Sequence, residues 1–195
     1  VTNMTYVDQM LDSPTNNFCT WNPLDSKSGD TYSEGNLKIV TVDSGDSPSR
    51  ATFSVTSGKW YWEVQRIGTG SPDLAIGIME QSEAYADLIG TTAKSWSYYS
   101  NNGNKYHGSF SSSSYGDSFG DGDIISVALD MDAGTIKFYK NGTVQDSGTA
   151  AFTSITGTIA PAISDGGAGT STAIANFGQD SSFAGTKTAQ GNQDD

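Results

Sequence analysis

The sequence predicts an all-β protein, built as a two-sheet antiparallel β-sandwich. Apolar and polar residues alternate over short runs, as expected for strands with one buried face. Gly, Asn and Asp separate these runs, and no segment shows the sustained spacing of an amphipathic helix. The chain has 195 residues, of which 11% are aromatic. That length suits one domain with a sizeable core, and large aromatic side chains can fill the space between two sheets.

Nine runs are predicted as strands, in this order: 37–42, 51–55, 59–67, 74–79, 96–99, 124–131, 135–140, 159–163 and 173–177. In the run 59–67, Trp60, Trp62 and Val64 fall on one face, which we expect to be the inner one. A short helix or turn could form only at 82–90 or near residues 7–11.

Two tight turns can be predicted from the residue types that form them. Asp132-Ala133-Gly134 should join the runs 124–131 and 135–140, with Gly134 at the position that needs positive φ. Asn141-Gly142 favours a type I′ turn, in which both central residues have positive φ.

The two ends of the chain differ in composition from the middle. Residues 1–36 are predicted as an extended N-terminal arm packed on the sandwich, and 37–178 as the sandwich itself. Residues 179–195 are polar and are predicted as a linker or tail. The arm should be pinned by its sparse large side chains, which are Tyr6, Met10, Leu11, Phe18, Trp21 and Leu24. Because the first residue is Val, we expect a processed product or a piece of a longer chain.

Charge and cysteine content exclude several classes of function. The net charge is −12, and the ten basic residues form no run, so binding to nucleic acid or to an anionic membrane is not expected. No stretch approaches the roughly 20 apolar residues of a membrane span. The single cysteine, Cys19, permits neither an intrachain disulfide nor a cysteine-based metal site.

The stretch 58–178 contains a series of motifs in a fixed order. They are 58–64 (GKWYWEV), 75–78 (AIGI), 95–98 (SWSY), 103–107 (GNKYH), 122–125 (GDII), 129–142 (LDMDAGTIKFYKNG), 161–163 (PAI) and 176–178 (NFG). In content and order this series resembles the SPRY domain family. The resemblance implies a concanavalin-like antiparallel sandwich. It also implies a binding role without catalysis, in which loops at one end hold the partner.

The leading segment carries a second resemblance. Residues 12–20 (DSPTNNFCT) and 22–25 (NPLD) resemble SPRY-containing bacteriophage structural proteins such as tail fibres. This resemblance implies a virion protein that attaches to a host-surface glycan or protein, contacts other virion subunits and forms a homo-oligomer, expected to be a trimer. The alternatives are a capsid-decoration or spacer domain and, less favoured, a glycan depolymerase.

Catalytic residues are not expected, and no cofactor is implied. His107 is the only histidine, and no Gly-x-Ser-x-Gly motif accompanies it. Asp130 and Asp132 flank a turn, where such side chains bond to backbone N–H groups. We therefore predict that the chain is not an enzyme.

A calcium site is the alternative to a metal-free chain. Asp117, Asp121 and Asp123 lie within seven residues, separated by glycines. Calcium prefers six to eight oxygen ligands. However, the loop lacks the terminal Glu of an EF-hand, so we expect no metal.

Aromatic residues interleaved with Ser, Asn and Gly give the best ligand-binding candidates, because this mixture is typical of adaptable binding loops. Residues 109–114, which carry no charge, are expected to form a tip loop. The candidate residues are Asp73, Trp96, Tyr99, Tyr106, His107 and Tyr115. Trp96 is the one among them that we most expect to be buried in the core.

Overall fold

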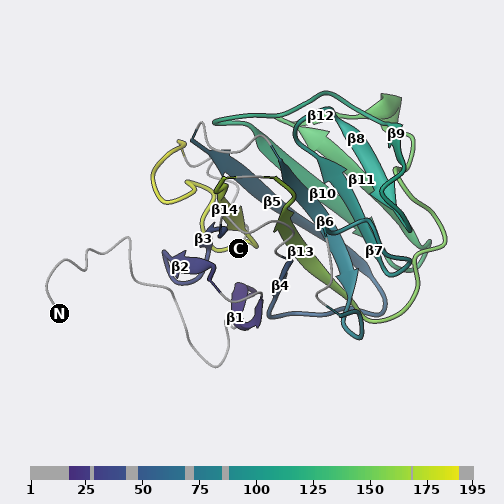
Figure 1. Ribbon diagram of the computed structural model, residues 1–195, viewed down its shortest axis with the longest axis horizontal. Coiled ribbons are helices and arrows are strands. Elements are labelled where there is room, and N and C mark those ends of the chain that lie inside the picture. The colour runs from purple at the N-terminus through teal and green to yellow at the C-terminus, as the bar shows by residue number, and fades with distance from the viewer. Residues whose placement is uncertain are drawn as a thin grey trace, which may run out of the picture.

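The computed structural model describes residues 18–26, 29–42, 48–68, 73–84, 88–167 and 169–188. They form two facing antiparallel sheets of seven strands each (Figure 1). The first sheet has the order β1 (Trp21–Ser26), β4 (Ser49–Ala51), β13 (Ile159–Asp165), β6 (Leu74–Glu80), β7 (Ser95–Tyr99), β8 (Asn104–His107) and β9 (Ser112–Ser114). The second has the order β12 (Thr143–Val144), β11 (Thr135–Lys140), β10 (Ile124–Asp130), β5 (Lys59–Ile67), β14 (Thr172–Asn176), β3 (Lys38–Val40) and β2 (Thr31–Ser33).

The prediction of an all-β sandwich is confirmed. Within the described residues the one helical element is the short 3-10 turn η2 (Asp146–Gly148). None of the described helical structure is long and apolar enough to cross a membrane. Residues 7–11 and 85–87 lie outside the described residues.

Eight of the nine predicted strands are present. The run 51–55 is the exception, because β4 ends at Ala51 and only Val55 pairs further on, as an isolated bridge to Ile159. Five strands were not predicted, namely β1, β2, β8, β9 and β12. They lack apolar alternation; β9, for example, consists of three exposed serines within the predicted tip loop.

The described part of the predicted arm belongs to the sandwich, because β1 pairs with β4 and β2 pairs with β3. Trp21 is fully buried, with its ring 5.3 Å from that of Phe177. Leu24 is 97% exposed, so the expectation that it pins the arm is wrong. Tyr6, Met10 and Leu11 lie outside the described residues.

The described part of the C-terminal segment also packs on the domain. Phe183 is 2% exposed and contacts Leu37 and Ile174. The side chain of Thr186 donates a hydrogen bond to Gln65. Residues 179–188 are therefore part of the folded unit, and they do not form the polar linker predicted for them.

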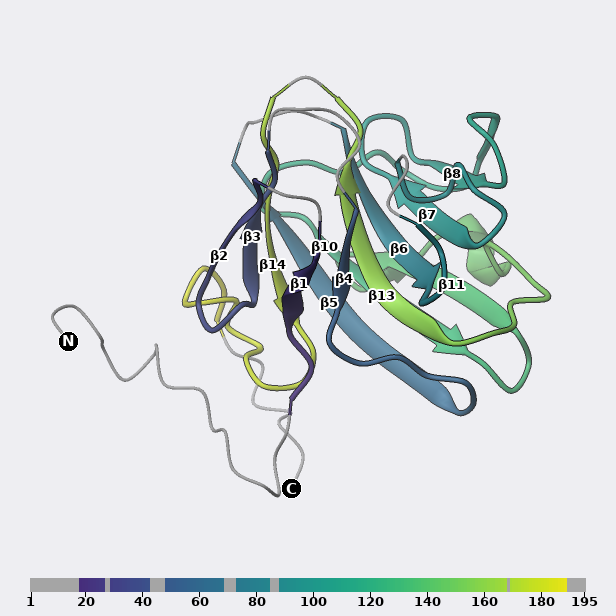
Figure 2. The same ribbon diagram turned by 60° about the horizontal axis from the view of Figure 1, so that its bottom comes forward.

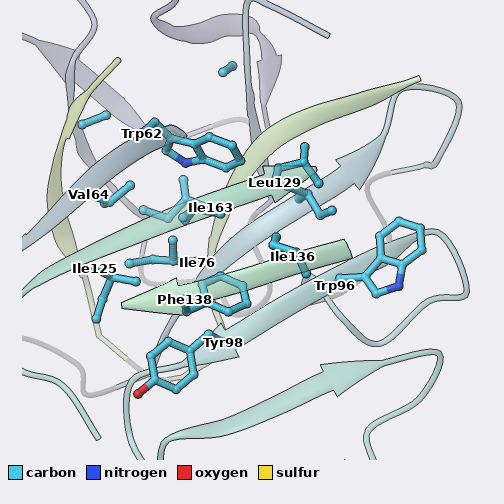
Figure 3. Packing of buried hydrophobic residues seen from close by; sticks show 14 of the residues in the cluster. Trp62, Val64, Ile76, Trp96, Tyr98, Ile125, Leu129, Ile136, Phe138 and Ile163 are labelled. Carbon is cyan, nitrogen blue, oxygen red and sulfur yellow. The ribbon is translucent and has the colours of Figure 1, made fainter. Parts of the chain in front are cut away.

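Aromatic and branched aliphatic side chains meet between the sheets (Figure 3). Tyr98 from β7 lies at the centre of this core, 5.4 Å from the ring of Phe138 on β11 and 5.2 Å from that of Phe119. Trp62 and Val64 of β5 point inward as predicted, whereas Trp60 on the same face lies beyond the core and is 45% exposed. Cys19 is free and buried.

Both predicted turns are present. Asn141 and Gly142 have φ of 49° and 79°, as a type I′ turn requires. The carboxylate of Asp130 accepts hydrogen bonds from the backbone N–H groups of Asp132 and Ala133, and that of Asp132 accepts one from Gly58. The two carboxylates therefore stabilise turns.

The centre of the first sheet requires a glycine in β6. A Cβ atom at Gly77 would overlap the carbonyl oxygen of Trp96 and lie 2.8 Å from the Cα of Ser97. These atoms belong to the backbone of β7, which pairs with β6 along its whole length and cannot move aside cheaply.

We expect Gly77→Ala to lower the free energy of unfolding by roughly 3 kcal/mol, because the added methyl group overpacks the sheet. Gly120→Ala is the matched control, since nothing lies within 4 Å of its Cβ position and its φ is not in the left-handed region. Its stability should stay within about 0.5 kcal/mol of the parent. Urea denaturation measures both, and equal midpoints for the two variants would contradict this packing.

Candidate functional site

Several connections meet at one end of the sandwich, which we call the loop end. It is defined by Thr41 after β3, Arg66 near the end of β5, Asp73 before β6, the turn at 100–103 after β7, and residues 165–167 and 169–171 at and after the end of β13. Figure 2 shows the last residues of β3, β5 and β13 at the same end of the molecule. Antiparallel pairing brings them together, since Asp165 at the end of β13 is paired with Leu74 at the start of β6.

Asp73 links three of these connections. Its carboxylate accepts hydrogen bonds from the Tyr99 hydroxyl at 2.7 Å and from the Asn101 side-chain amide at 3.0 Å. Its carbonyl accepts one from the backbone N–H of Gly166 at 2.8 Å. A Cβ atom at Gly167 would overlap the Asp73 carboxylate, so this close approach requires glycine. Burial raises the pKa of Tyr99, and the hydrogen bond to Asp73 and its charge raise it further.

A second polar group is fully buried behind Asp73. The carboxylate of Asp165 accepts hydrogen bonds from the Thr41 hydroxyl at 2.8 Å and from the backbone N–H of Gly167 at 3.1 Å. The Thr41 hydroxyl oxygen accepts one from the backbone N–H of Ser171 at 2.8 Å. Since buried polar groups left without partners are costly, this network fixes the start of the β13–β14 connection.

Arg66 is the basic residue of the loop end and is 5% exposed. Its guanidinium donates a hydrogen bond to the Phe119 carbonyl at 3.1 Å. Burial lowers the pKa of Arg66, and four carboxylates act in the opposite direction. These belong to Asp165, Asp121, Asp73 and Asp123. The loop end is therefore rich in negative charge, with its single described arginine buried.

Of the predicted ligand-binding residues, the structure brings together Asp73, Tyr99 and Tyr106. The Tyr106 ring lies 5.3 Å from that of Tyr99 in an edge-on arrangement and is half-buried. Tyr99 itself is 9% exposed, so its contribution is the hydrogen bond that positions Asp73.

Two other predicted residues lie at a different place, on β7 and β8. Trp96 is 7% exposed and belongs to the core. His107 is exposed, stacks on Trp96 with ring centroids 4.8 Å apart, and donates a hydrogen bond from Nδ1 to the Ser95 carbonyl at 2.9 Å. His107 therefore covers the edge of the core and does not belong to the loop end.

Tyr115 is 4% exposed, and its ring packs against Tyr98 and Phe138. Its hydroxyl group donates a hydrogen bond to the Thr149 carbonyl and accepts one from the Phe138 amide. Burial thus removes Tyr115 and Trp96 from the surface that a ligand could contact. The spacing of aromatic residues in the sequence did not distinguish core from loop at these positions.

The three carboxylates of the calcium alternative have separate surroundings in the structure. Among the described residues no three His, Cys, Asp or Glu side chains gather as metal ligands. Asp121 accepts a hydrogen bond from the Gly68 backbone, and Asp123 accepts others from Gly120 and Asn141. Asp117 is exposed. The carboxylates of Asp121 and Asp123 are therefore engaged in separate turns, and that of Asp117 faces solvent.

The pKa of Asp123 lies below its usual value. Partial burial alone would raise it, but hydrogen bonds from Gly120 and Asn141 and the Lys140 ammonium group at 3.4 Å together outweigh burial. A carboxyl group with a depressed folded pKa stabilises the fold above its unfolded pKa, and that contribution is lost as the pH falls through the folded value.

We expect Asp123→Asn to lower the free energy of unfolding by about 1 kcal/mol at pH 7. The difference from the parent should shrink as the pH falls below about 3.9, the unfolded value for Asp. Thermal unfolding from pH 7 to acid checks this, with Asp117→Asn as a control because its exposed carboxylate accepts no hydrogen bond from any described residue. A difference that does not change with pH would refute the assignment.

Comparison with known proteins identifies the fold family. A family model described as the SPRY domain matches residues 59–180. The chain belongs to the SPRY domain family. The SPRY domain of human HERC1 superposes with a TM-score of 0.68 at 23% identity, covering 80% of this chain and 96% of that domain. A second human SPRY domain gives a TM-score of 0.66 at 18% identity, covering 80% of this chain and 98% of that domain.

Curated relatives match about two thirds of the chain. Ran-binding protein 9 of Danio rerio is 29% identical over 131 residues, which are 63% of this chain and 22% of the relative. The human protein is 28% identical over 131 residues, 63% of this chain and 18% of the relative. This SPRY chain therefore spans about a fifth of the length of these relatives. They are animal proteins, so the bacteriophage context has no support from them.

The sequence did not single out Arg66, Asn101 or Asp165 as parts of the loop end. Each sits at a strand end or turn, where polar residues are common, and their proximity depends on strand pairing. One signal was present: Arg66 is one of two arginines in the chain and closes a largely apolar strand.

Proposed function

We propose that this SPRY domain is a non-catalytic module that binds a basic protein surface at its loop end. SPRY domains mediate protein–protein interactions, and the loop end is the place where the strands of both sheets present loops on a rigid support. The observation that carries the proposal is the charge of this end, where the charges of Asp73, Asp165 and the nearby Asp121 and Asp123 act on Arg66, the one described arginine there, which is buried.

Electrostatic complementarity favours a partner with exposed Lys or Arg. The chain carries a net charge of −12, so acidic partners are repelled from a distance and basic ones are attracted. Hydrogen bonds from Tyr99 and Asn101 hold the Asp73 carboxylate in place, so this carboxylate needs little ordering when the partner binds.

The absence of catalysis is part of the same proposal. The ring of His107 is engaged with the carbonyl group of Ser95 and with the face of Trp96, and no nucleophile in the described part of the chain shares a hydrogen bond with it. Asp130 and Asp132 hold turns. A general base beside a nucleophile, or two carboxylates across a groove, would be needed for hydrolysis.

Panning a random peptide display library against the protein tests the proposal. We expect enrichment of peptides rich in Lys and Arg. The affinity of such a peptide should fall about fivefold in Asp73→Asn, the effect of roughly 1 kcal/mol. Asn keeps an acceptor for Tyr99 and Asn101, so the variant removes charge and preserves shape.

Asp146→Asn is the matched control, because this exposed carboxylate lies at η2, away from the loop end, and it should bind like the parent. Enrichment of neutral or acidic peptides would overturn the proposal. So would an equal loss of affinity in both variants.

The virion setting remains a proposal of ours that rests on the resemblance of residues 12–25 to bacteriophage structural proteins. In that setting the domain attaches a virion, as part of a tail-fibre-like homotrimer, to a host-surface protein or glycan. The rival role is contact with other virion subunits as a decoration or spacer domain. Labelling of intact particles with an antibody against this domain distinguishes them, since a loop end buried in the particle cannot reach a host.

A further inference from the structure

A second hollowed surface lies at the opposite end of β5 from the loop end. Trp60 stands near the start of this strand, six residues before Arg66, and strands rise about 3.3 Å per residue. Phe53, Val55 and Trp60 line two adjoining hollows, which together we call the aromatic cleft. One hollow, of about 490 Å³, is completed by Thr52, Ser54, Thr56 and Ser57. The other, of about 150 Å³, is apolar and reaches inward to Trp62, Leu129 and Phe177.

The aromatic cleft presents a flat ring in a fixed position. Trp60 is 45% exposed, and its Nε1 donates a hydrogen bond to the Ser57 carbonyl at 2.8 Å. This bond holds the indole in place before any ligand arrives, so little side-chain freedom is lost on binding. Phe53 and Tyr61 beside it are 39% and 60% exposed.

Hydroxyl groups border this ring. Those of Thr56 and Ser57 are exposed and make no hydrogen bond within the described residues. The other two are engaged: Thr52 accepts a hydrogen bond from the Thr20 backbone, and Ser54 donates one to Gln81. The hydroxyl groups of Thr56 and Ser57 can each donate and accept a hydrogen bond. Both residues line the same hollow as the Trp60 ring.

Charge is missing from this site, in contrast to the loop end. No carboxylate, ammonium or guanidinium group lines either hollow. In a chain of net charge −12, a partner recognised through its own charge would gain nothing here. The cleft thus combines an exposed aromatic ring, two available hydroxyl groups and a lining without charged side chains. An uncharged ligand that has an apolar face and several hydroxyl groups matches these three features.

We propose that the aromatic cleft binds an uncharged pyranose ring of a glycan. The C–H face of the sugar lies on Trp60, and its hydroxyl groups exchange hydrogen bonds with Thr56 and Ser57. A small apolar substituent, such as the methyl group of an acetamido sugar, enters the hollow that leads to Trp62 and Leu129. This site is separate from the protein-binding loop end.

Titration of the full chain with neutral sugars, followed by ¹H–¹⁵N NMR, tests the proposal. The probes are methyl α-glucopyranoside, methyl α-mannopyranoside and N-acetylglucosamine, with glucuronic acid as the charged counterpart. We expect saturable shifts of the Trp60 indole N–H and of the Phe53 and Thr56 amides, with the strongest binding for N-acetylglucosamine. Glucuronic acid should bind more weakly than the neutral sugars.

Trp60→Ala should weaken binding about tenfold or more, since it removes the stacking face. Thr56→Val, which changes only an exposed side chain, should weaken it without affecting the fold. Phe110→Ala, at another exposed aromatic residue on the β8–β9 turn, and Asp73→Asn at the loop end should leave sugar binding unchanged.

Four outcomes would overturn the proposal. The first is that no neutral sugar gives saturable shifts at the cleft, and the second is that the shifts persist in Trp60→Ala. Glucuronic acid could bind as tightly as the neutral sugars. Finally, short apolar peptides could bind in a Trp60-dependent manner where sugars do not, which would make the cleft a peptide site.

Discussion

The packing of side chains between the two sheets holds this domain together, because the described residues contain no disulfide bond or metal site that would join the sheets. The one cysteine is free, and no metal ligands gather among the described residues. Tyr98 from the first sheet and Phe138 from the second contact each other across the core (Figure 3). Apolar burial contributes roughly 25 cal/mol per Å², so a continuous core of this kind can supply the stability that a disulfide would add elsewhere.

The same strands carry two chemically different ends. At the loop end lie Arg66 near the end of β5, Asp73 just before β6 and Asp165 at the end of β13. Each of these side chains makes hydrogen bonds with neighbouring segments. At the other end, β5 begins beside Trp60 in an uncharged, aromatic hollow. Because a strand is rigid along its length, each end can hold a partner without rearranging the other.

The alternation of apolar and polar residues predicted the β-sandwich and nine strands, of which eight are present. It could do so because a strand with one buried face alternates in this way. It could not give β8, β9 and β12, whose residues are short or polar and are ordered by pairing alone. Alternation also does not say where a core ends. Trp60 and Trp62 share a face, yet one is exposed and the other is buried. Similarly, Tyr106 stays near the surface while Tyr115 packs inside, a difference that depends on sheet geometry.

If the core is the central constraint, the two sheets must unfold as one unit. Native-state amide hydrogen exchange measures this directly. The amides of β5, β6, β10 and β13 should exchange slowest, with one common free energy equal to that of global unfolding, whereas the edge strands β2 and β9 exchange faster. Distinct free energies for β5 and β10 on one side, and for β6 and β13 on the other, would show that the sheets open separately and would contradict the account.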